Sequence, residues 1–318
     1  MKDGYVTSEG SSNEHFANTT IMTVQAPEEP SVRGTVPSGV LRRPWYMDRE
    51  YLLGGWADPP LRYSFFAVSG RQVLEAFGTA FYVYVSGSIS TTLMNYGITQ
   101  TGGYVGFGNI ALLSLFIYAT GSATGGHLNP LVSFSAIISG VLPVSRGILY
   151  LLGQALGGAV AGGVLAGVYG RDRAIRVEGG GCYFDESLVT PGQVFLNECF
   201  SSLAYLYISY GVGIDPSQGL LFGPRLAPLL AGGCLGLVTF ATSGIIPGYA
   251  GAQMNPARCF GFGIARRDMS DQWIWWFAPA AAALLLAFVF NFAPLHADDG
   301  EAVARRPGRP QSGRDDAA

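Results

Sequence analysis

The chain has 318 residues; 49% of them are hydrophobic, only 13% are charged, and the formal net charge is −3 at pH 7. Soluble domains usually contain about 25% charged residues, so this composition favours a membrane protein. The slightly negative charge argues against a nucleic-acid-binding protein. The four cysteines have no Cys-x-x-Cys spacing and the three histidines are scattered, so the sequence predicts neither a metal site nor a cofactor.

Two polar segments flank the apolar part of the chain. Residues 1–45 are rich in Ser, Thr, Pro, Glu and Gly, a composition typical of disordered segments. We therefore expect a largely disordered N-terminal tail over residues 1–70 and a second polar tail over residues 293–318. Residues 71–292 form the predicted membrane domain.

Six apolar stretches follow one another in this domain, each close to the ~20 residues that a helix needs to cross a bilayer. They cover residues 72–94, 107–125, 147–170, 192–212, 226–247 and 272–292. An even number of crossings puts both tails on one side of the membrane. Arginines precede the first stretch and follow the last, and the positive-inside rule then predicts cytoplasmic tails, although other arginines fall on the opposite side.

One short motif occurs twice. The sequence GGHLNPLVSF at residues 125–134 aligns without gaps with GAQMNPARCF at residues 251–260. Each copy follows the second apolar stretch of a three-stretch half, so the chain divides into a first repeat over residues 71–170 and a second over residues 192–292. An odd number of crossings in each half inverts the second half relative to the first. Such inverted repeats place their functional site near the membrane midplane.

The Asn-Pro pair in each motif predicts the start of a helix, since Asn is a favoured N-cap and Pro a favoured first helical residue. The apolar pieces that follow, residues 131–139 and 257–265, are too short to cross a bilayer. We therefore expect two half-helices that enter from opposite faces and meet N-terminus to N-terminus. Their positive dipole ends converge at the midplane, where the Asn129 and Asn255 amides offer N–H groups to a passing oxygen.

The predicted midplane of the pathway consists of Asn129, Pro130, Leu131, Asn255, Pro256 and Ala257. A constriction of this kind favours neutral, hydrogen-bonding solutes and repels cations and protons. The alternative is that both Asn-Pro pairs are unrelated turns in loops. Their matched context and their matched place in each half argue against it.

The paired motifs, the arginine that follows the second one and the spacing across six stretches resemble the major intrinsic protein family, the aquaporins and glycerol facilitators. The resemblance covers residues 70–292. It implies an all-α membrane protein with six transmembrane helices plus two re-entrant half-helices, arranged as an inverted three-helix repeat. It also implies a passive channel for water and small uncharged solutes, embedded in a lipid bilayer as a homotetramer with one pore per subunit.

Two glutamates agree with this family. Glu75 and Glu198 lie in the equivalent stretches of the two halves, where the family carries buried glutamates that accept hydrogen bonds from the re-entrant loops. A carboxylate at membrane depth needs such a partner. His127 also matches the family; its expected role is a hydrogen bond that orients the loop, and the alternative is a part in pH gating.

In this family four side chains near the outer mouth set selectivity. Gapless alignment from the two asparagines assigns them to Asn109, Ser243, Ala252 and Arg258. Small residues at two of these corners indicate a filter wider than a water-only pore, so glycerol, urea and hydrogen peroxide are the expected solutes beside water. Leu131 stands where the family usually has alanine, and we expect it to alter water flux.

The sequences NPARC and GGGC resemble the subfamily of uncharacterised intrinsic proteins of plants and fungi. Both of their cysteines, Cys259 and Cys182, fall in connections on the non-cytoplasmic side, so we expect them to approach and form a disulfide, with two free thiols as the alternative. Cys199 and Cys234 lie within apolar stretches, where cysteine packs as a small apolar residue. The expected location is the plasma membrane, with both termini cytoplasmic.

Two other functions compete with a channel. A membrane adhesion or scaffold protein could use the same fold with little flux. An intramembrane enzyme is disfavoured, because the apolar stretches contain no HExxH, no GxSxG and no paired aspartates.

Overall fold

The computed structural model describes residues 61–292. The C-terminal tail and most of the predicted N-terminal tail lie outside this range. The first helix begins at Leu61, ten residues before the predicted boundary of the membrane domain.

The described chain is all-α. Its six long helices are α2 (Leu61–Asn95), α3 (Thr101–Thr124), α5 (Val144–Tyr169), α7 (Pro191–Ser209), α8 (Pro216–Thr242) and α10 (Gln272–Phe292). Shorter elements are α4 (Pro130–Ile138), α6 (Arg171–Arg176), the 3₁₀ turn η2 (Glu178–Gly180), the π-helical turn η3 (Tyr210–Ile214) and α9 (Pro256–Arg266). Within residues 61–292 no strand forms; a single isolated β-bridge pairs Phe184 with Tyr249.

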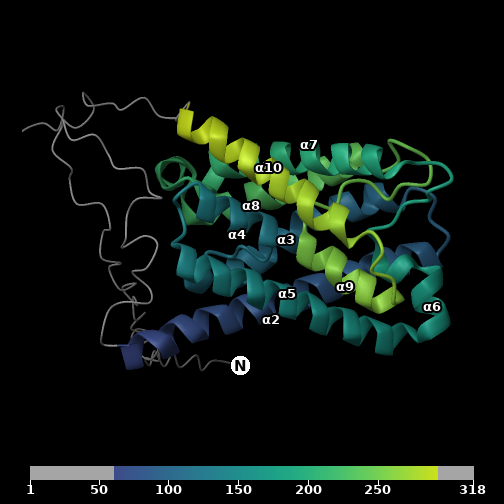
Figure 1. The fold of residues 1–318 in the computed structure, drawn as a ribbon, viewed down its shortest axis with the longest axis horizontal. Coiled ribbons are helices and arrows are strands. Elements are labelled where there is room, and N and C mark those ends of the chain that lie inside the picture. Colours follow the sequence, from purple (N-terminus) through teal and green to yellow (C-terminus); the bar gives the residue numbers. More distant parts are fainter. Residues whose placement is uncertain (1–60, 293–318) are drawn as a thin grey trace, which may run out of the picture. The chain divides into compact units, whose positions relative to one another are not determined.

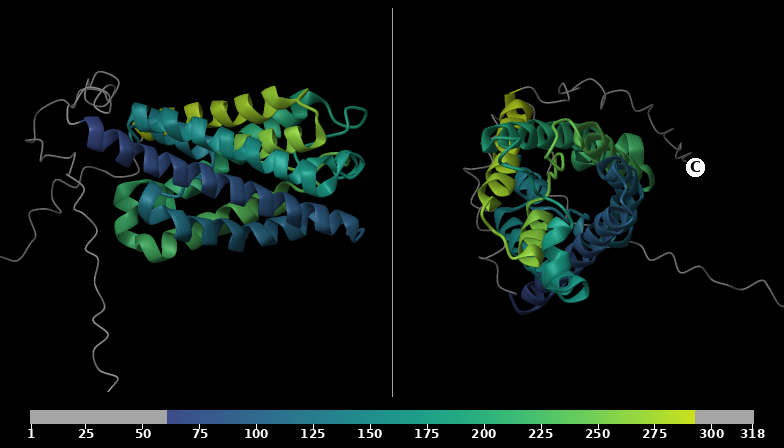
Figure 2. Two further views of the ribbon diagram at one scale, coloured as in Figure 1. Left: turned by 90° about the horizontal axis from the view of Figure 1, so that it is seen from below. Right: turned by 90° about the vertical axis from the view of Figure 1, so that its right-hand side faces the viewer.

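The predicted inverted repeat is present in the order of the elements. Each half has two long helices, a short one and a third long one: α2, α3, α4, α5 and then α7, α8, α9, α10. Helices α4 and α9 extend toward opposite ends of the bundle (Figure 1). Seen end-on, the long helices form a ring (Figure 2). The halves meet where α3 packs on α8 and α5 packs on α9.

Both ends of α8 differ from the sequence-based prediction. The stretch predicted over residues 226–247 is helical from Pro216 to Thr242. It stops there because Gly244 adopts a φ of +81° and Pro247 follows. Near its start, Gly223 has non-helical backbone angles and interrupts the helix.

Close packing of α5 depends on glycine. A Cβ atom at Gly158 would overlap the carbonyl oxygen of Ala257, and one at Gly162 would overlap that of Gly261, so both positions accept only a hydrogen. Gly158 and Gly162 stand four residues apart, a small-xxx-small spacing that brings α5 and α9 into backbone contact. Gly163 and Gly167, which share the spacing, face no neighbouring atom within 4 Å.

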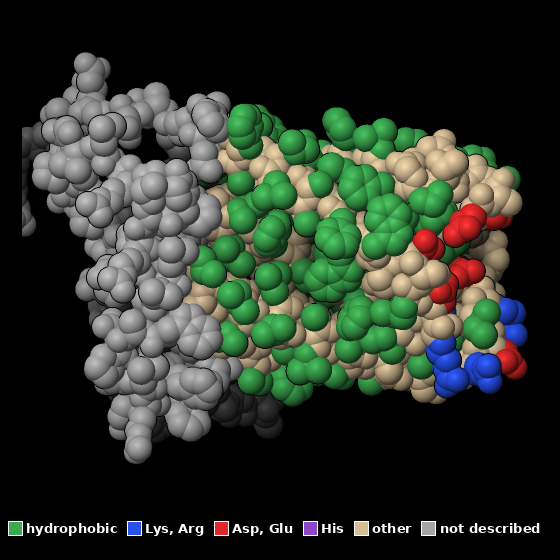
Figure 3. Space-filling view, in the orientation of Figure 1, with side chains coloured by type: hydrophobic (Ala, Val, Ile, Leu, Met, Phe, Trp, Pro, Cys, Tyr) green, Lys and Arg blue, Asp and Glu red, His purple; other side chains and the backbone are tan. Residues whose placement is uncertain are grey.

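Four helical segments in the described chain are long and apolar enough to cross a membrane: α3, α5, residues 225–242 of α8 and residues 272–290 of α10. The other two long helices, α2 and α7, carry the buried Glu75 and Glu198 together with several serines, which lowers their hydropathy. In Figure 3 apolar side chains cover the visible face, and charged side chains gather at the end that holds α6. An apolar belt with charges at its rim is the surface expected of a bilayer-spanning bundle.

Candidate functional site

The two asparagines cap the two half-helices as predicted. The Asn129 Oδ1 atom accepts a hydrogen bond from the Leu131 amide at 2.9 Å, and the Asn255 Oδ1 atom accepts one from the Arg258 amide at 3.2 Å. In both helices proline occupies the first position. The caps satisfy backbone donors that a buried helix start would otherwise leave unpaired.

The same two side chains also fasten the loops to each other. Asn129 Nδ2 donates to the Met254 carbonyl at 2.8 Å, and Asn255 Nδ2 donates to the Leu128 carbonyl at 3.1 Å. Leu128 and Met254 have φ values of +52° and +53°, a left-handed conformation that costs a non-glycine residue about 1–3 kcal/mol. One N–H of each amide is thus already bonded. The sequence predicts that the N–H groups of both side-chain amides are free. In the structure one of the two N–H groups on each amide is bonded to the other loop, so for that group the prediction is wrong.

A buried glutamate supports the first re-entrant loop. Glu75 Oε1 accepts from the Leu128 amide and from Gln154 Nε2, the latter at 2.9 Å. Gln154 Nε2 also donates to Ser133 Oγ at 2.8 Å, and His127 Nδ1 lies 3.0 Å from the same oxygen. His127 therefore has the loop-orienting contact that the sequence analysis expected.

Glu198 supports the second loop through more bonds. Its carboxylate accepts from the backbone amides of Gln253 and Met254 at 2.7 and 3.1 Å and from the Tyr249 hydroxyl at 2.9 Å. Glu198 is fully buried. The loop backbone thus finds its partners inside the protein, as irregular backbone at membrane depth requires.

A cavity of about 190 Å³ lies against the second loop. Arg258 reaches it, with Nη1 donating to Gln253 Oε1 at 2.9 Å. The guanidinium carbon lies 5.2 Å from the centre of the Phe262 ring, a cation–π distance, and the Nε atom is buried without a partner. The other walls combine small and hydroxyl-bearing residues, including Ser90, Thr99, Thr101, Gly102, Val105, Tyr183, Thr239, Ser243 and Tyr249.

The four predicted filter positions separate in the structure. Ser243 and Arg258 line this outer cavity, whereas Asn109 does not. On α3 the cavity wall is Val105, one helical turn nearer the outer end. Asn109 is 2% exposed, and its Nδ2 atom has no hydrogen-bond partner. Asn109 therefore lies about one turn deeper than this cavity, and its place in the filter stays a prediction.

Ala252 also lies behind the cavity rather than in its wall. It is 1% exposed, and its amide donates to Thr242 Oγ1 at 3.1 Å. This bond joins the descending loop to the end of α8. Ala252 thus contributes to loop packing at the outer mouth.

Three residues predicted at the midplane are buried beside a surface groove. Pro130, Leu131 and Pro256 line an apolar groove on the outside of the bundle. Ala257 is fully buried, with its carbonyl against Gly158 of α5. Of the predicted midplane set, Asn129 and Asn255 are the residues whose side chains join the two loops. Leu131 is 1% exposed, and its expected effect on water flux stays a prediction.

The structure contains a disulfide between Cys182 and Cys259, with Cα atoms 5.4 Å apart. It ties the connection after α6 to α9. Cys182 Sγ lies 3.4 Å from Gln253 Oε1, the acceptor of the Arg258 bond. Arg266 Nη1 donates to the Gly181 carbonyl at 3.1 Å and holds the same connection. Cys199 and Cys234 are free and buried.

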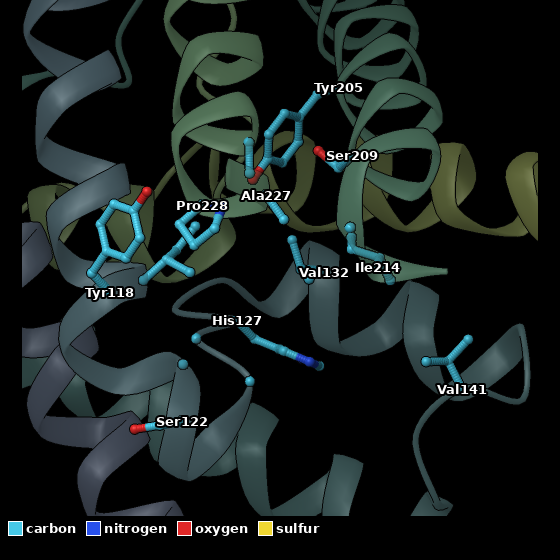
Figure 4. A pocket seen from close by; sticks show the side chains of 16 residues that line it. Tyr118, Ser122, His127, Val132, Val141, Tyr205, Ser209, Ile214, Ala227 and Pro228 are labelled. Carbon is cyan, nitrogen blue, oxygen red and sulfur yellow. The ribbon is translucent and has the colours of Figure 1, made fainter. Parts of the chain in front are cut away.

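A second, larger cavity of about 450 Å³ lies against the first re-entrant loop. Figure 4 shows His127 extending below it and Tyr205 with Ser209 above it. Ser209 Oγ is buried and has no partner, and the Tyr118 hydroxyl donates to the Arg225 carbonyl at the rim. The cavities thus differ in charge: the outer one has a buried arginine, and the inner one has neutral hydroxyls and an imidazole.

Sequence reasoning missed Gln253, Tyr249, Tyr205 and Ser209. Gln253 carried a signal, because it stands two residues before Asn255, as His127 stands two residues before Asn129. The others lie on separate elements and meet the site only through folding. No group of His, Cys, Asp and Glu side chains within the described residues could hold a metal ion.

Comparison with known proteins agrees with this geometry. The sequence model of the family described as "Major intrinsic protein" matches residues 64–290. The chain belongs to the major intrinsic protein family. It is similar to the probable aquaporin TIP-type alpha of Phaseolus vulgaris, with 34% identity over 179 residues that cover 56% of this chain and 64% of that relative. The aquaporin TIP2-1 of Zea mays is 30% identical over 72% of this chain and 89% of its own length.

The fold comparison is independent of close sequence similarity. The X-ray structure of the aquaglyceroporin from Plasmodium falciparum matches with a TM-score of 0.57 and 16% identity, covering 71% of this chain and 96% of that one. This major intrinsic protein is therefore an integral membrane protein with the fold of its family, and in general terms a channel for water or small solutes.

Proposed function

We propose that this major intrinsic protein is a passive channel for water and the small neutral solutes glycerol, urea and hydrogen peroxide, and that it excludes ions and protons. The observation that carries the proposal is the pair of capped half-helices. Their N-termini meet through the crossed bonds of Asn129 and Asn255, with one cavity against each loop. Each asparagine keeps a second amide N–H for a solute oxygen.

Electrostatics support the exclusion of cations. Two helix N-termini each carry about half a positive charge. Arg258 adds a buried cation at the outer cavity. A neutral solute can exchange its hydrogen bonds with water for bonds with these donors, while a cation meets like charge in a low-dielectric setting.

The outer cavity supports solutes larger than water. Its wall carries Gly102 and Val105 from α3 and Ser243 directly after α8, none of which has a large side chain, and its hydroxyls offer hydrogen bonds to a polyol or an amide. Pore width and lining donors decide which neutral solute passes. These features favour glycerol and urea over a strict water filter.

The disulfide supports a topology with cytoplasmic tails. It lies at the end of the bundle that holds α6, opposite the end where the described chain begins and finishes (Figure 1). Disulfides persist on the oxidising side of a membrane, so that end faces away from the cytosol. We propose the plasma membrane as the location and a homotetramer with one pore per subunit as the assembly.

Stopped-flow light scattering on proteoliposomes tests the function, with water, glycerol, urea and hydrogen peroxide compared at equal protein content. We expect flux above that of empty vesicles and unchanged proton permeability. Ser243→Trp, which fills the outer cavity, should abolish the added flux. Phe240→Trp, on the lipid-facing side of the same helix, is the matched control and should retain it.

A membrane adhesion or scaffold protein on the same fold is the competing function. It predicts flux equal to that of empty vesicles for every solute, and equal behaviour of the two tryptophan variants. Retention of added flux by Ser243→Trp alone would remove the outer cavity from the pathway.

A further inference from the structure

An apolar groove of about 450 Å³ lies on the outer surface of the bundle, separate from both pathway cavities. Its wall on α10 includes Trp273, Trp276 and Phe277, and its floor includes the prolines that begin α4 and α9. Trp273 and Phe277 are 47% and 65% exposed, so the groove opens toward the bilayer. Figure 3 views the face on which α10 lies, where apolar side chains predominate. A volume of this size is typical of small-molecule sites.

One polar atom at the start of α10 lacks a partner. Gln272 lines the groove, and its Nε2 atom donates to the Cys259 carbonyl at 3.0 Å. A carbonyl can only accept, so this bond fixes which end of the Gln272 amide carries the nitrogen. The other end, Oε1, is buried and has no hydrogen-bond partner. A buried acceptor without a partner costs about 1–3 kcal/mol, so the site calls for a donor.

The chemistry of that donor is narrowly constrained. None of the described residues that line the groove is charged, so a phospholipid phosphate finds no cation there. A single acceptor at one end of an apolar, aromatic-walled groove fits a ligand with one neutral hydroxyl on a rigid apolar body. Tryptophans such as Trp273 and Trp276 usually mark the membrane–water interface, the level at which a membrane-embedded alcohol holds its hydroxyl.

The groove extends from this acceptor toward the membrane centre. Gln272 and Ala280 both line it and are separated by eight residues of α10, a rise of about 12 Å. Such a length suits the fused rings of a rigid lipid. An acyl chain could also fill it, but it carries no hydroxyl that could donate to Gln272 Oε1. Pro279, also in the wall, has no N–H to give the preceding turn, and its flat ring adds to the smooth surface.

We propose that this groove binds a membrane sterol, whose hydroxyl donates to Gln272 Oε1 and whose rings pack against Trp276 and Phe277. Oε1 is buried in this conformation, so the sterol hydroxyl reaches it when Gln272 rotates about its soft terminal torsion. The sterol contacts Pro130 and Pro256, the residues that follow the two capping asparagines. It therefore supports the joined half-helices from the lipid side.

Binding is measured without transport, which keeps this inference separate from the proposed function. The full chain is placed in phosphatidylcholine nanodiscs with a photoreactive cholesterol analogue, and the labelled peptide is identified by mass spectrometry. Cholesterol and its 3-O-methyl ether, which lacks the donor, serve as competitors. Three variants accompany the wild type: Ala280→Phe, which fills the groove; Gln272→Met, which removes the acceptor; and Leu285→Phe, a lipid-facing control on the same helix.

We expect saturable labelling between residues 272 and 280, lowered roughly fivefold or more by Ala280→Phe because an added ring must displace the ligand. Cholesterol should compete about 3–10 times better than its ether, the range for one hydrogen bond, and Gln272→Met should abolish this difference. Leu285→Phe should match the wild type. Equal competition by the ether in wild type, or undiminished labelling of a folded Ala280→Phe variant, overturns the proposal. So does intersubunit cross-linking through the groove, which would mean that a second copy fills it.

Discussion

The two re-entrant loops are joined at the midplane by equivalent asparagine hydrogen bonds, but different residues hold each loop in the bundle. In both, an asparagine caps the half-helix, and the residue before it is left-handed and gives its carbonyl to the other asparagine. The supports then diverge at positions that the repeat makes equivalent. Four residues after each asparagine stand Ser133, which is hydrogen-bonded, and Cys259, which is disulfide-bonded.

The positions that face the cavities differ as well. Three residues after the asparagine stand Val132 in the first half and Arg258 in the second, and each lines the cavity on its own side. Two residues before it stand His127 and Gln253. The repeat thus builds a symmetric midplane, while within the described residues the cavity-lining arginine and the disulfide both lie at the outer end. The repeated fold therefore sets the course of the pathway, while single substitutions such as Val132 against Arg258 make its two ends chemically different.

The largest expected effect comes from removing the carboxylates that hold the loops. Glu198→Ala strands two backbone N–H groups and the Tyr249 hydroxyl, whereas Glu75→Ala strands one backbone N–H and a shared Gln154 donor. At about 1–3 kcal/mol for each buried donor, we expect losses of roughly 4 and 2 kcal/mol in unfolding free energy. Thermal unfolding in detergent measures both.

Phe200→Ala, on the lipid-facing side of α7, serves as the control for the glutamate pair. Equal losses of unfolding free energy in the two glutamate variants would contradict the prediction that Glu198 stabilises its loop more than Glu75 does.

Cys259→Ser places a serine in the second half at the position equivalent to Ser133 of the first half. It removes the disulfide, and we expect a loss of about 2–4 kcal/mol in unfolding free energy, the usual range for a native bridge. The midpoint of thermal unfolding should fall by several degrees, and reductant should lower the wild type to the same value. Cys199→Ser, at a free and buried cysteine, keeps the bridge and should therefore lose stability on adding reductant as the wild type does, whereas Cys259→Ser should not respond. A wild type insensitive to reductant would contradict the bracing role.

Arg258→Val likewise copies the first half into the second. Loss of the fixed cation should raise proton leak roughly ten- to a hundredfold, which corresponds to about 1.4–2.8 kcal/mol less barrier to a positive charge. A pH-sensitive dye inside proteoliposomes measures the leak. Arg258→Lys keeps the charge without the planar fork and should retain most of the exclusion. A leak that stays at the wild-type level in the valine variant would locate the charge barrier elsewhere.

The smallest effect concerns acid. In the connection after α9, the hydroxyl and amide of Ser270 donate to Asp268 and hold the pKa of that carboxylate below its usual value. The equivalent position after α4 is the apolar Leu142. Because the folded-state pKa of Asp268 is lowered, its stabilising effect is present above the unfolded pKa and is lost as pH falls through the folded one.

Asp268→Asn keeps an acceptor for Ser270 but cannot titrate. We expect wild type to unfold about 1–2 °C above this variant at pH 6, and the gap to be smaller at pH 3, which lies closer to the lowered folded-state pKa of Asp268. Scanning unfolding at both pH values measures the gap. A gap of the same size at pH 3 would assign it to packing rather than charge.

The sequence by itself determined the features that depend on local chemistry. Six apolar stretches, the duplicated Asn-Pro motif and the length of each half-helix follow from hydropathy and from capping preferences that act within a few residues. The structure confirms the all-α fold and the capped starts at Asn129 and Asn255. The glutamate partners were predictable because a buried carboxylate must bond to something close.

Only the tertiary structure decided which side chains face which space. Successive residues of a helix point about 100° apart, so a shift of one turn or of one residue changes the cavity that a side chain reaches. Val105 therefore lines the outer cavity while Asn109 does not, and the buried Leu131 borders the groove on the outside of the bundle. Contacts such as Arg258 with Gln253, or Gln272 with the Cys259 carbonyl, join segments whose relative rotation arises from packing of the whole bundle and is not written in any local stretch of sequence.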